Sequence, residues 1–135
     1  MGSVQDRVRG MLLAGACGDA LGAPVEFLAL EDIRAKYGEL GPESYVGPAA
    51  YRGQITDDTQ MTLFTAEGVI RAAIRGRDGG TCDAARVVHH AYLRWLWTQG
   101  VRVERFAGEE NGPSGWLARQ TFLHEARAPG NTCLG

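Results

Sequence analysis

The stretch GQITDDTQMT, residues 53–62, places a threonine and two aspartates side by side, directly before a run with helical periodicity. From Thr56 onward, Met61, Phe64 and Gly68 recur at a spacing that puts them on one stripe of a helix. The stretch therefore predicts a helix that begins within it, and the rest of the chain is interpreted as scaffolding around this helix start.

The residues alone leave two interpretations of this helix start open. In the first, Thr56 or Asp57 is an ordinary N-cap, and the spacing of Asp57 and Gln60 predicts a capping box. In the second, Thr56, Asp57 and Asp58 direct a hydroxyl and two carboxylates toward one point, which is possible at a helix start and not in mid-helix. Such an all-oxygen cluster suits magnesium, manganese or calcium rather than zinc.

Outward from this stretch, hydrophobic periodicity predicts an all-α fold, because no segment alternates with the period of a strand. Two long loops, 38–53 and 100–115, separate the helices. The predicted helices span residues 4–21, 30–37, 56 or 57 to about 75, 82–97 and 114–126.

Two of these helices are predicted to contribute to the core. The helix after Thr56 is expected to bury Leu63, Ile70 and Ile74 as well as its first stripe, and the segment Gly76 to Gly80 is expected to end it. The helix over 82–97 is apolar on most sides, so we expect it in the interior.

The end of the first helix carries small residues and two acids. Gly15, Gly18 and Gly22 form a strip that lets another helix or a ligand approach the backbone. Pro24 is expected to hold Ala23 in an extended conformation and to end the helix. Asp19 lies before this point and Glu26 after it. Glu26 is either a solvated loop acid or a buried carboxylate with a displaced pKa.

Bulk properties describe one domain over residues 1–135 with a formal net charge of −2. That charge gives no electrostatic reason to expect nucleic acid or an anionic membrane as a partner. No apolar run is long enough for a membrane span, and no secretion signal is visible, so we expect a cytoplasmic protein. Cys17, Cys82 and Cys133 are widely spaced and predicted to be free thiols. His89 and His90 are interpreted as structural or surface groups.

Three segments taken together resemble the ADP-ribosylglycohydrolase family, which includes the dinitrogenase reductase-activating glycohydrolases. They are GDALGA at 18–23 with VEF at 25–27, GQITDDT at 53–59, and GNTC at 130–133. The resemblance implies an all-helical, orthogonal multi-helix bundle with a cleft for two magnesium or manganese ions. It also implies an enzyme that removes ADP-ribose from a modified protein side chain or a small acceptor.

By this resemblance, Thr56, Asp57 and Asp58 are metal ligands. Asp57, Asp58 and Glu26 are the expected catalytic residues, with Glu26 as the proton-handling group. Cleavage at the ribose anomeric carbon develops oxocarbenium character, so the catalyst must orient the sugar and deliver a water.

Substrate contact is assigned to Asn131 and Gly53 on the same basis. The acceptor is left open, because Ala128 stands where the nitrogenase branch carries an acidic residue. No aspartate follows Asp83, so the family's later Asp-x-Asp ligands have no counterpart in this sequence. The chain is accordingly interpreted as the N-terminal part of such a domain, apparently truncated.

Two other functions are compatible with the same residues. The chain could be a noncatalytic ADP-ribose-binding module, or a structural bundle in which residues 56–60 only cap a helix. Apolar helix faces without a partner would also favour self-association.

Overall fold

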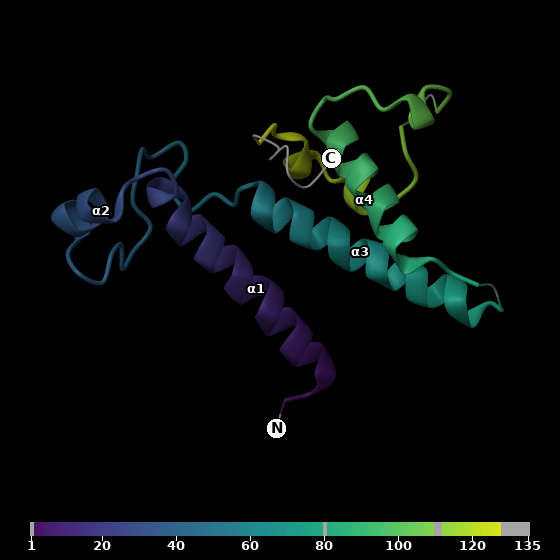
Figure 1. Ribbon diagram of the computed structural model, residues 1–135, viewed down its shortest axis with the longest axis horizontal. Coiled ribbons are helices and arrows are strands. Elements are labelled where there is room, and N and C mark those ends of the chain that lie inside the picture. The colour runs from purple at the N-terminus through teal and green to yellow at the C-terminus, as the bar shows by residue number, and fades with distance from the viewer. Residues whose placement is uncertain (1, 80, 110–111, 128–135) are drawn as a thin grey trace. The chain divides into compact units, whose positions relative to one another are not determined.

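The structure is a computed structural model that describes residues 2–79, 81–109 and 112–127. Every regular element in these ranges is helical, which confirms the all-α prediction (Figure 1). The α-helices are α1 (Val4–Gly22), α2 (Leu30–Tyr37), α3 (Asp57–Arg77) and α4 (Ala84–Thr98). The 3-10 helices are η1 (Ala23–Val25), η2 (Glu104–Phe106), η3 (Leu117–Arg119) and η4 (Thr121–His124).

The chain divides into two compact units, residues 1–59 and residues 60–135, and each is described by itself. The single domain expected over residues 1–135 stays a prediction. No single helix in the described ranges is long and apolar enough to cross a membrane, although the bent pair of Val4–Val25 and Leu30–Tyr37 passes that test of length and composition together.

The first unit begins with α1, and a capping box stabilises the N-terminus of this helix. The amide of Asp6 donates to Ser3 Oγ over 3.1 Å, and the amide of Ser3 donates to Asp6 Oδ2 over 3.0 Å. After Gly22 the chain continues into η1, and α2 then runs at 98° to the preceding helical segment.

The predicted extended conformation of Ala23 is wrong. Ala23 has φ −48° and ψ −41°, so it is helical and opens η1. Pro24 fits this first turn because its fixed φ suits a helix and its missing N–H would have no partner there.

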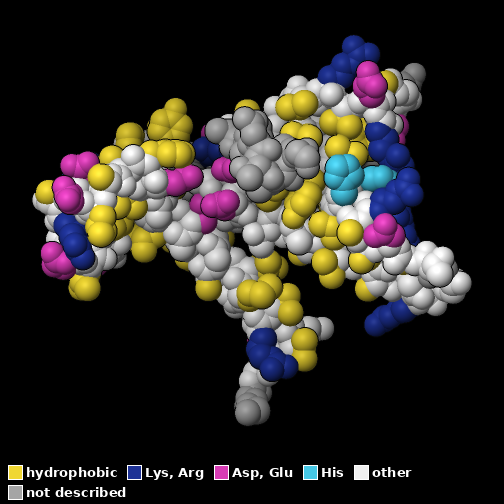
Figure 2. Space-filling model, in the orientation of Figure 1, with side chains coloured by type: hydrophobic (Ala, Val, Ile, Leu, Met, Phe, Trp, Pro, Cys, Tyr) yellow, Lys and Arg dark blue, Asp and Glu magenta, His cyan; other side chains and the backbone are white. Residues whose placement is uncertain are grey.

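The apolar side of α1 lies at the surface of its unit. Figure 2 shows hydrophobic side chains at the surface of this helix. Val4, Val8, Met11 and Leu13 are exposed, and the only buried residue of the helix is Ala20. Within the described part of its own unit, nothing lies within 4 Å of a Cβ built on Gly15, Gly18 or Gly22, so no helix of that unit packs on the strip. Self-association through this apolar side stays a prediction.

The second unit is built on the packing of α3 against α4. Its core contains Phe64, Ala91, Trp95, Leu117 and Leu123, which come from α3, α4, η3 and η4. The predicted interior position of α4 is thereby confirmed. The described cysteines, Cys17 and Cys82, are free thiols as expected, whereas Cys133 lies outside the described residues.

Gly68 sets the separation of α3 and α4. A Cβ placed on Gly68 would lie 2.9 Å from Val88 Cα and 3.2 Å from Ala91 Cβ. This close approach explains a glycine in mid-helix, where glycine otherwise costs about 1 kcal/mol relative to alanine. Ile70 and Ile74 are exposed, so their predicted burial is wrong; the face that meets α4 carries Gly68.

Polar groups also tie the two helices together. Glu67 of α3 lies 3.6 Å from Nε of the buried Arg94 of α4, and it accepts a hydrogen bond from the Trp116 amide. Trp95 Nε1 donates to Gln60 Oε1 over 2.9 Å. Because the Gln60 side chain is 1% exposed and committed to Trp95, the predicted capping box of Asp57 and Gln60 is wrong.

One predicted helix also needs correction. Residues 114–126 were expected to form one helix, but only the short η3 and η4 form there. Buried Leu117 and Leu123 anchor these turns from two separate segments, with Gln120 in an extended conformation between them. The predicted end of α3 is confirmed, because the helix ends at Arg77, within the segment from Gly76 to Gly80.

A pair of glycine substitutions on α3 tests this packing. Gly68→Ala should destabilise the protein by about 1–3 kcal/mol, because the new methyl group meets backbone that cannot move aside cheaply. Gly76→Ala is the matched control, since nothing lies within 4 Å of its built Cβ; it should stabilise by about 0.5–1 kcal/mol. Urea denaturation measures both, and equal effects of the two substitutions would contradict the assignment.

Candidate functional site

The start of α3 is tied to the end of α1 by the carboxylate of Asp19. The Thr56 amide donates to Asp19 Oδ2 over 2.8 Å, and the Thr56 hydroxyl donates to Oδ1 over 2.6 Å. The amide and hydroxyl of Thr59 also donate to Oδ2. One half-buried carboxylate thus accepts four hydrogen bonds from the first unit's last residues.

These hydrogen bonds determine the charge state of Asp19. Burial by itself raises the pKa of the Asp19 carboxyl, but the hydrogen bonds from Thr56 and Thr59 outweigh it and hold the pKa below its usual value. Asp19 is therefore ionised at neutral pH and a permanent acceptor for both threonines.

Thr56 is the N-cap of α3, which confirms one of the two predicted caps. Its Oγ1 accepts a hydrogen bond from the Asp58 amide over 3.2 Å, and the same hydroxyl donates a hydrogen bond to Asp19. A hydroxyl oxygen has two lone pairs, so one remains after this bond. Asp19 thus fixes the Thr56 hydroxyl with an oxygen lone pair available to a further partner.

Asp57 and Asp58 are the two carboxylates of the first turn of α3. Asp57 is partly exposed and Asp58 is exposed. Neither carboxylate forms a hydrogen bond or an ion pair with any residue that the structure describes. Since Thr56 and Asp19 already satisfy the amides of Asp58 and Thr59, the two acids are not needed as caps.

Gly53 has a conformational role just before this site. Its φ is +73°, a value that side-chain-bearing residues rarely adopt, and it follows Tyr51 in a turn closed by the Gln54 amide. A Cβ on Gly53 would meet the Tyr45 ring at 3.5 Å. Substrate contact by Gly53 stays a prediction.

A hollow lies between α1 and the long loop of the same unit. Its volume is about 470 Å³, and Cys17, Gly18 and Leu21 of α1 line it together with Glu43, Ser44 and Tyr45 of the long loop. The loop over 38–53 therefore borders a cavity.

Glu26 follows η1 and is exposed, which corresponds to the solvated alternative. Within the described ranges, no group of three or more His, Cys, Asp or Glu side chains is arranged to hold a metal ion. The structure therefore does not gather Glu26 with Asp57 and Asp58 into one such group. Asn131, the other predicted substrate contact, lies outside the described residues.

Asp19 is the site residue that sequence analysis did not assign. A physical signal for it existed, because it lies near the C-terminal end of α1, where the helix dipole disfavours a negative charge. An acid at that place needs compensating donors, and the two threonines of the 53–62 stretch are those donors.

The donor set at the start of α3 fits a hard divalent cation in its chemistry. Two carboxylates without partners in the described ranges and one oriented hydroxyl oxygen are ligands that magnesium and manganese prefer. Three such groups fill only part of an octahedral shell, so water or substrate would have to supply the remaining ligands.

Comparisons with known proteins show the family of the chain. A model of the ADP-ribosylglycohydrolase family matches residues 1–135. Over 102 residues the chain is 37% identical to the ADP-ribosyl-[dinitrogen reductase] glycohydrolase of Rhodospirillum rubrum, covering 75% of this chain and 32% of that protein.

An uncharacterized protein of Archaeoglobus fulgidus is 40% identical over 70 residues, which is 50% of this chain and 22% of that protein. The chain thus spans about a third or less of the length of these curated relatives. No solved structure matches it.

The depressed pKa of Asp19 predicts acid sensitivity. A carboxyl whose folded pKa lies below its unfolded pKa of about 3.9 stabilises the fold above that pH, and the contribution is lost as pH falls through the folded pKa. Asp19→Asn should therefore lower the melting temperature at pH 6 and reduce the further loss between pH 6 and pH 3.

Thermal unfolding followed by circular dichroism measures this difference. Asp32→Asn, an exposed acid in the first turn of α2, is the control and should keep the wild-type pH dependence. An unchanged pH dependence in Asp19→Asn would contradict the role of its carboxylate.

Proposed function

Because the chain belongs to the ADP-ribosylglycohydrolase family, we propose that it contributes the first part of a divalent-metal site to a hydrolase that releases ADP-ribose from a modified protein or a small acceptor. The observation that carries the proposal is the pair of carboxylates of Asp57 and Asp58, which have no partner among the described residues and follow an oriented threonine hydroxyl. A helix start built only for capping would not need them.

In this proposal, Thr56, Asp57 and Asp58 hold magnesium or manganese. The bound ion would supply a water of lowered pKa and a point of attachment for the ribose hydroxyls. Asp19 would act as a positioning residue and not as a ligand of the ion, because it accepts the hydrogen bond of the Thr56 hydroxyl and leaves an oxygen lone pair of that hydroxyl available.

Glu26 is the proposed proton-handling residue. Its exposed position after η1 lets it exchange a proton with water or with a bound substrate. In hydrolysis at an anomeric carbon, a carboxylate can accept the proton of the attacking water, and this role is consistent with a group outside the metal ligand set.

A noncatalytic ADP-ribose-binding module is the second candidate. The observation that favours it is the small number of protein ligands at the start of α3, which leaves a bound ion mostly to water and predicts weak affinity. Turnover by the 135-residue chain is accordingly expected to be low.

Manganese titration followed by electron paramagnetic resonance tests the metal site. The wild-type chain should bind Mn²⁺ weakly, and Asp57→Asn or Asp58→Asn should weaken binding by at least about tenfold, since each removes one of two charged ligands. Asp32→Asn removes an equal charge from the first turn of another helix and should have no effect. An equal loss of Mn²⁺ affinity in all three variants would mean that binding depends only on the overall negative charge of the protein. That result would refute the site.

Calorimetry with ADP-ribose in the presence of Mn²⁺ separates the candidate functions. Binding that disappears in Asp57→Asn, together with ADP-ribose released from an ADP-ribosylated protein, supports the hydrolase. Binding without release supports the noncatalytic module. If neither is observed, residues 56–60 serve as a helix cap.

A further inference from the structure

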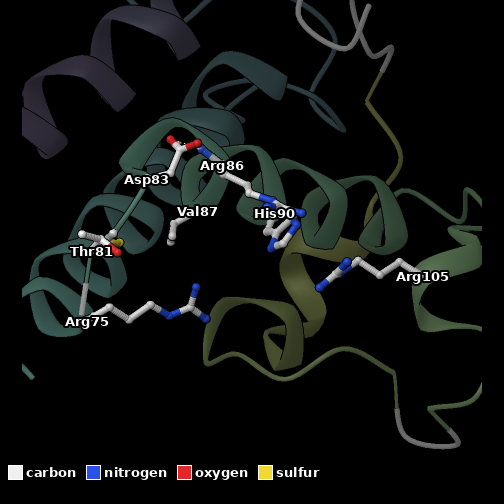
Figure 3. A pocket seen from close by; sticks show the side chains of 8 residues that line it. Arg75, Thr81, Asp83, Arg86, Val87, His90 and Arg105 are labelled. Atoms are coloured by element: carbon white, nitrogen blue, oxygen red, sulfur yellow. Dashed lines mark hydrogen bonds between the residues drawn. The ribbon is translucent and has the colours of Figure 1, made fainter. Parts of the chain in front are cut away.

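A second charged site lies in the other unit, near the far end of α3. A hollow of about 360 Å³ is lined by three arginines, one histidine and a single carboxylate (Figure 3). We call it the arginine pocket. Its lining residues are Arg75, Thr81, Cys82, Asp83, Arg86, Val87, His90 and Arg105.

The three arginines come from different segments of the fold. Arg75 is in the last turn of α3, Arg86 is in the first turns of α4, and Arg105 is in η2. In Figure 3, Arg75 and Arg105 extend toward one another from opposite sides, with His90 between them in this view. Tertiary folding, and not a local run of basic residues, has therefore gathered this charge.

Within the described residues, the Asp83 carboxylate is the only negative charge in the lining of the arginine pocket, against three arginines. None of Arg75, Arg86 and Arg105 has an ion pair with a residue inside the described ranges. Asp83 is already in use as the N-cap of α4, where its Oδ1 accepts from the Arg86 amide over 3.1 Å. Such a gathering of like charge is unfavourable until an anion enters.

The pKa of His90, the histidine of the arginine pocket, is lower than usual. Burial lowers the pKa of His90, and the positive charges of Arg105, His89, Arg86 and Arg94 lower it further. His90 is therefore neutral at pH 7 and can donate or accept one hydrogen bond without adding to the repulsion. His90 lines the arginine pocket and therefore offers a ligand a polar contact between the guanidinium groups.

The geometry points to a binding site for the phosphoryl group of a small phosphorylated compound in the arginine pocket. Guanidinium groups match phosphate oxygens with paired hydrogen bonds. A tetrahedral dianion can be approached from three directions, which suits three arginines on three elements better than a planar carboxylate does. The volume lies near the lower end of the range of about 300–1,000 Å³ found for small-molecule sites.

This site is separate from the proposed metal centre along the chain. Arg75 belongs to the last turn of α3, whereas Asp57 and Asp58 belong to its first turn. The proposal therefore does not depend on metal binding or hydrolysis, and each can fail without the other.

Titration of the 135-residue chain with inorganic pyrophosphate, at constant ionic strength and without divalent metal, tests the arginine pocket. Calorimetry should detect binding, and amide resonances of Val87 and His90 should shift in nuclear magnetic resonance spectra. Arg75→Gln and Arg105→Gln should each weaken binding by about tenfold, the usual scale for one charge-assisted contact.

Arg77→Gln is the matched control, because it removes an exposed arginine from the same last turn of α3 and does not line the hollow. Its affinity should equal that of the wild type. The proposal is overturned if pyrophosphate does not bind, if Arg77→Gln weakens binding as much as the other two variants, or if malonate binds more tightly than pyrophosphate.

Discussion

The hydrogen bonds accepted by Asp19 are the interaction on which the candidate site depends. A single ionised carboxylate at the end of α1 receives the amides and hydroxyls of Thr56 and Thr59. Two segments about 40 residues apart in sequence are thereby joined, as the 37 and 40 residue separations of these bonds show. The cost of placing an acid at a helix C-terminus is offset by two threonine hydroxyls and by two backbone amides that a helix start leaves without intrahelical partners.

The capping of α3 by Asp19 and Thr56 affects the chemistry that is available to Asp57 and Asp58. Helix starts normally use acidic side chains as caps, and here Asp19 and Thr56 take that role. Asp57 and Asp58 keep their lone pairs free of described protein partners, which is the condition a metal ligand must meet. Membership of the ADP-ribosylglycohydrolase family gives these free carboxylates a chemical context, and their capacity to hold a cation stands as our proposal.

The second unit is stabilised mainly by the packing of α3 against α4. Gly68 allows α3 and α4 to approach at van der Waals distance, and Gln60 and Glu67 supply the polar contacts across them. Burial of Gln60 explains why it does not cap its own helix. The three arginines of the arginine pocket come from α3, α4 and η2, and none of them has an ion-pair partner in the described chain.

Local sequence determined the helical class, the interior position of α4 and the start of α3 to within one residue, with Thr56 or Asp57 as the N-cap, because periodicity and capping act within a few residues. The sequence also predicted Thr56, Asp57 and Asp58 as metal ligands. Only tertiary structure decided the partner of Thr56, the burial of Gln60 and the exposure of Ile70 and Ile74. Those outcomes depend on which helix face meets a distant segment, and a single helix's periodicity does not contain that information. The same reason explains why residues 114–126 fold as two short turns around separate buried leucines.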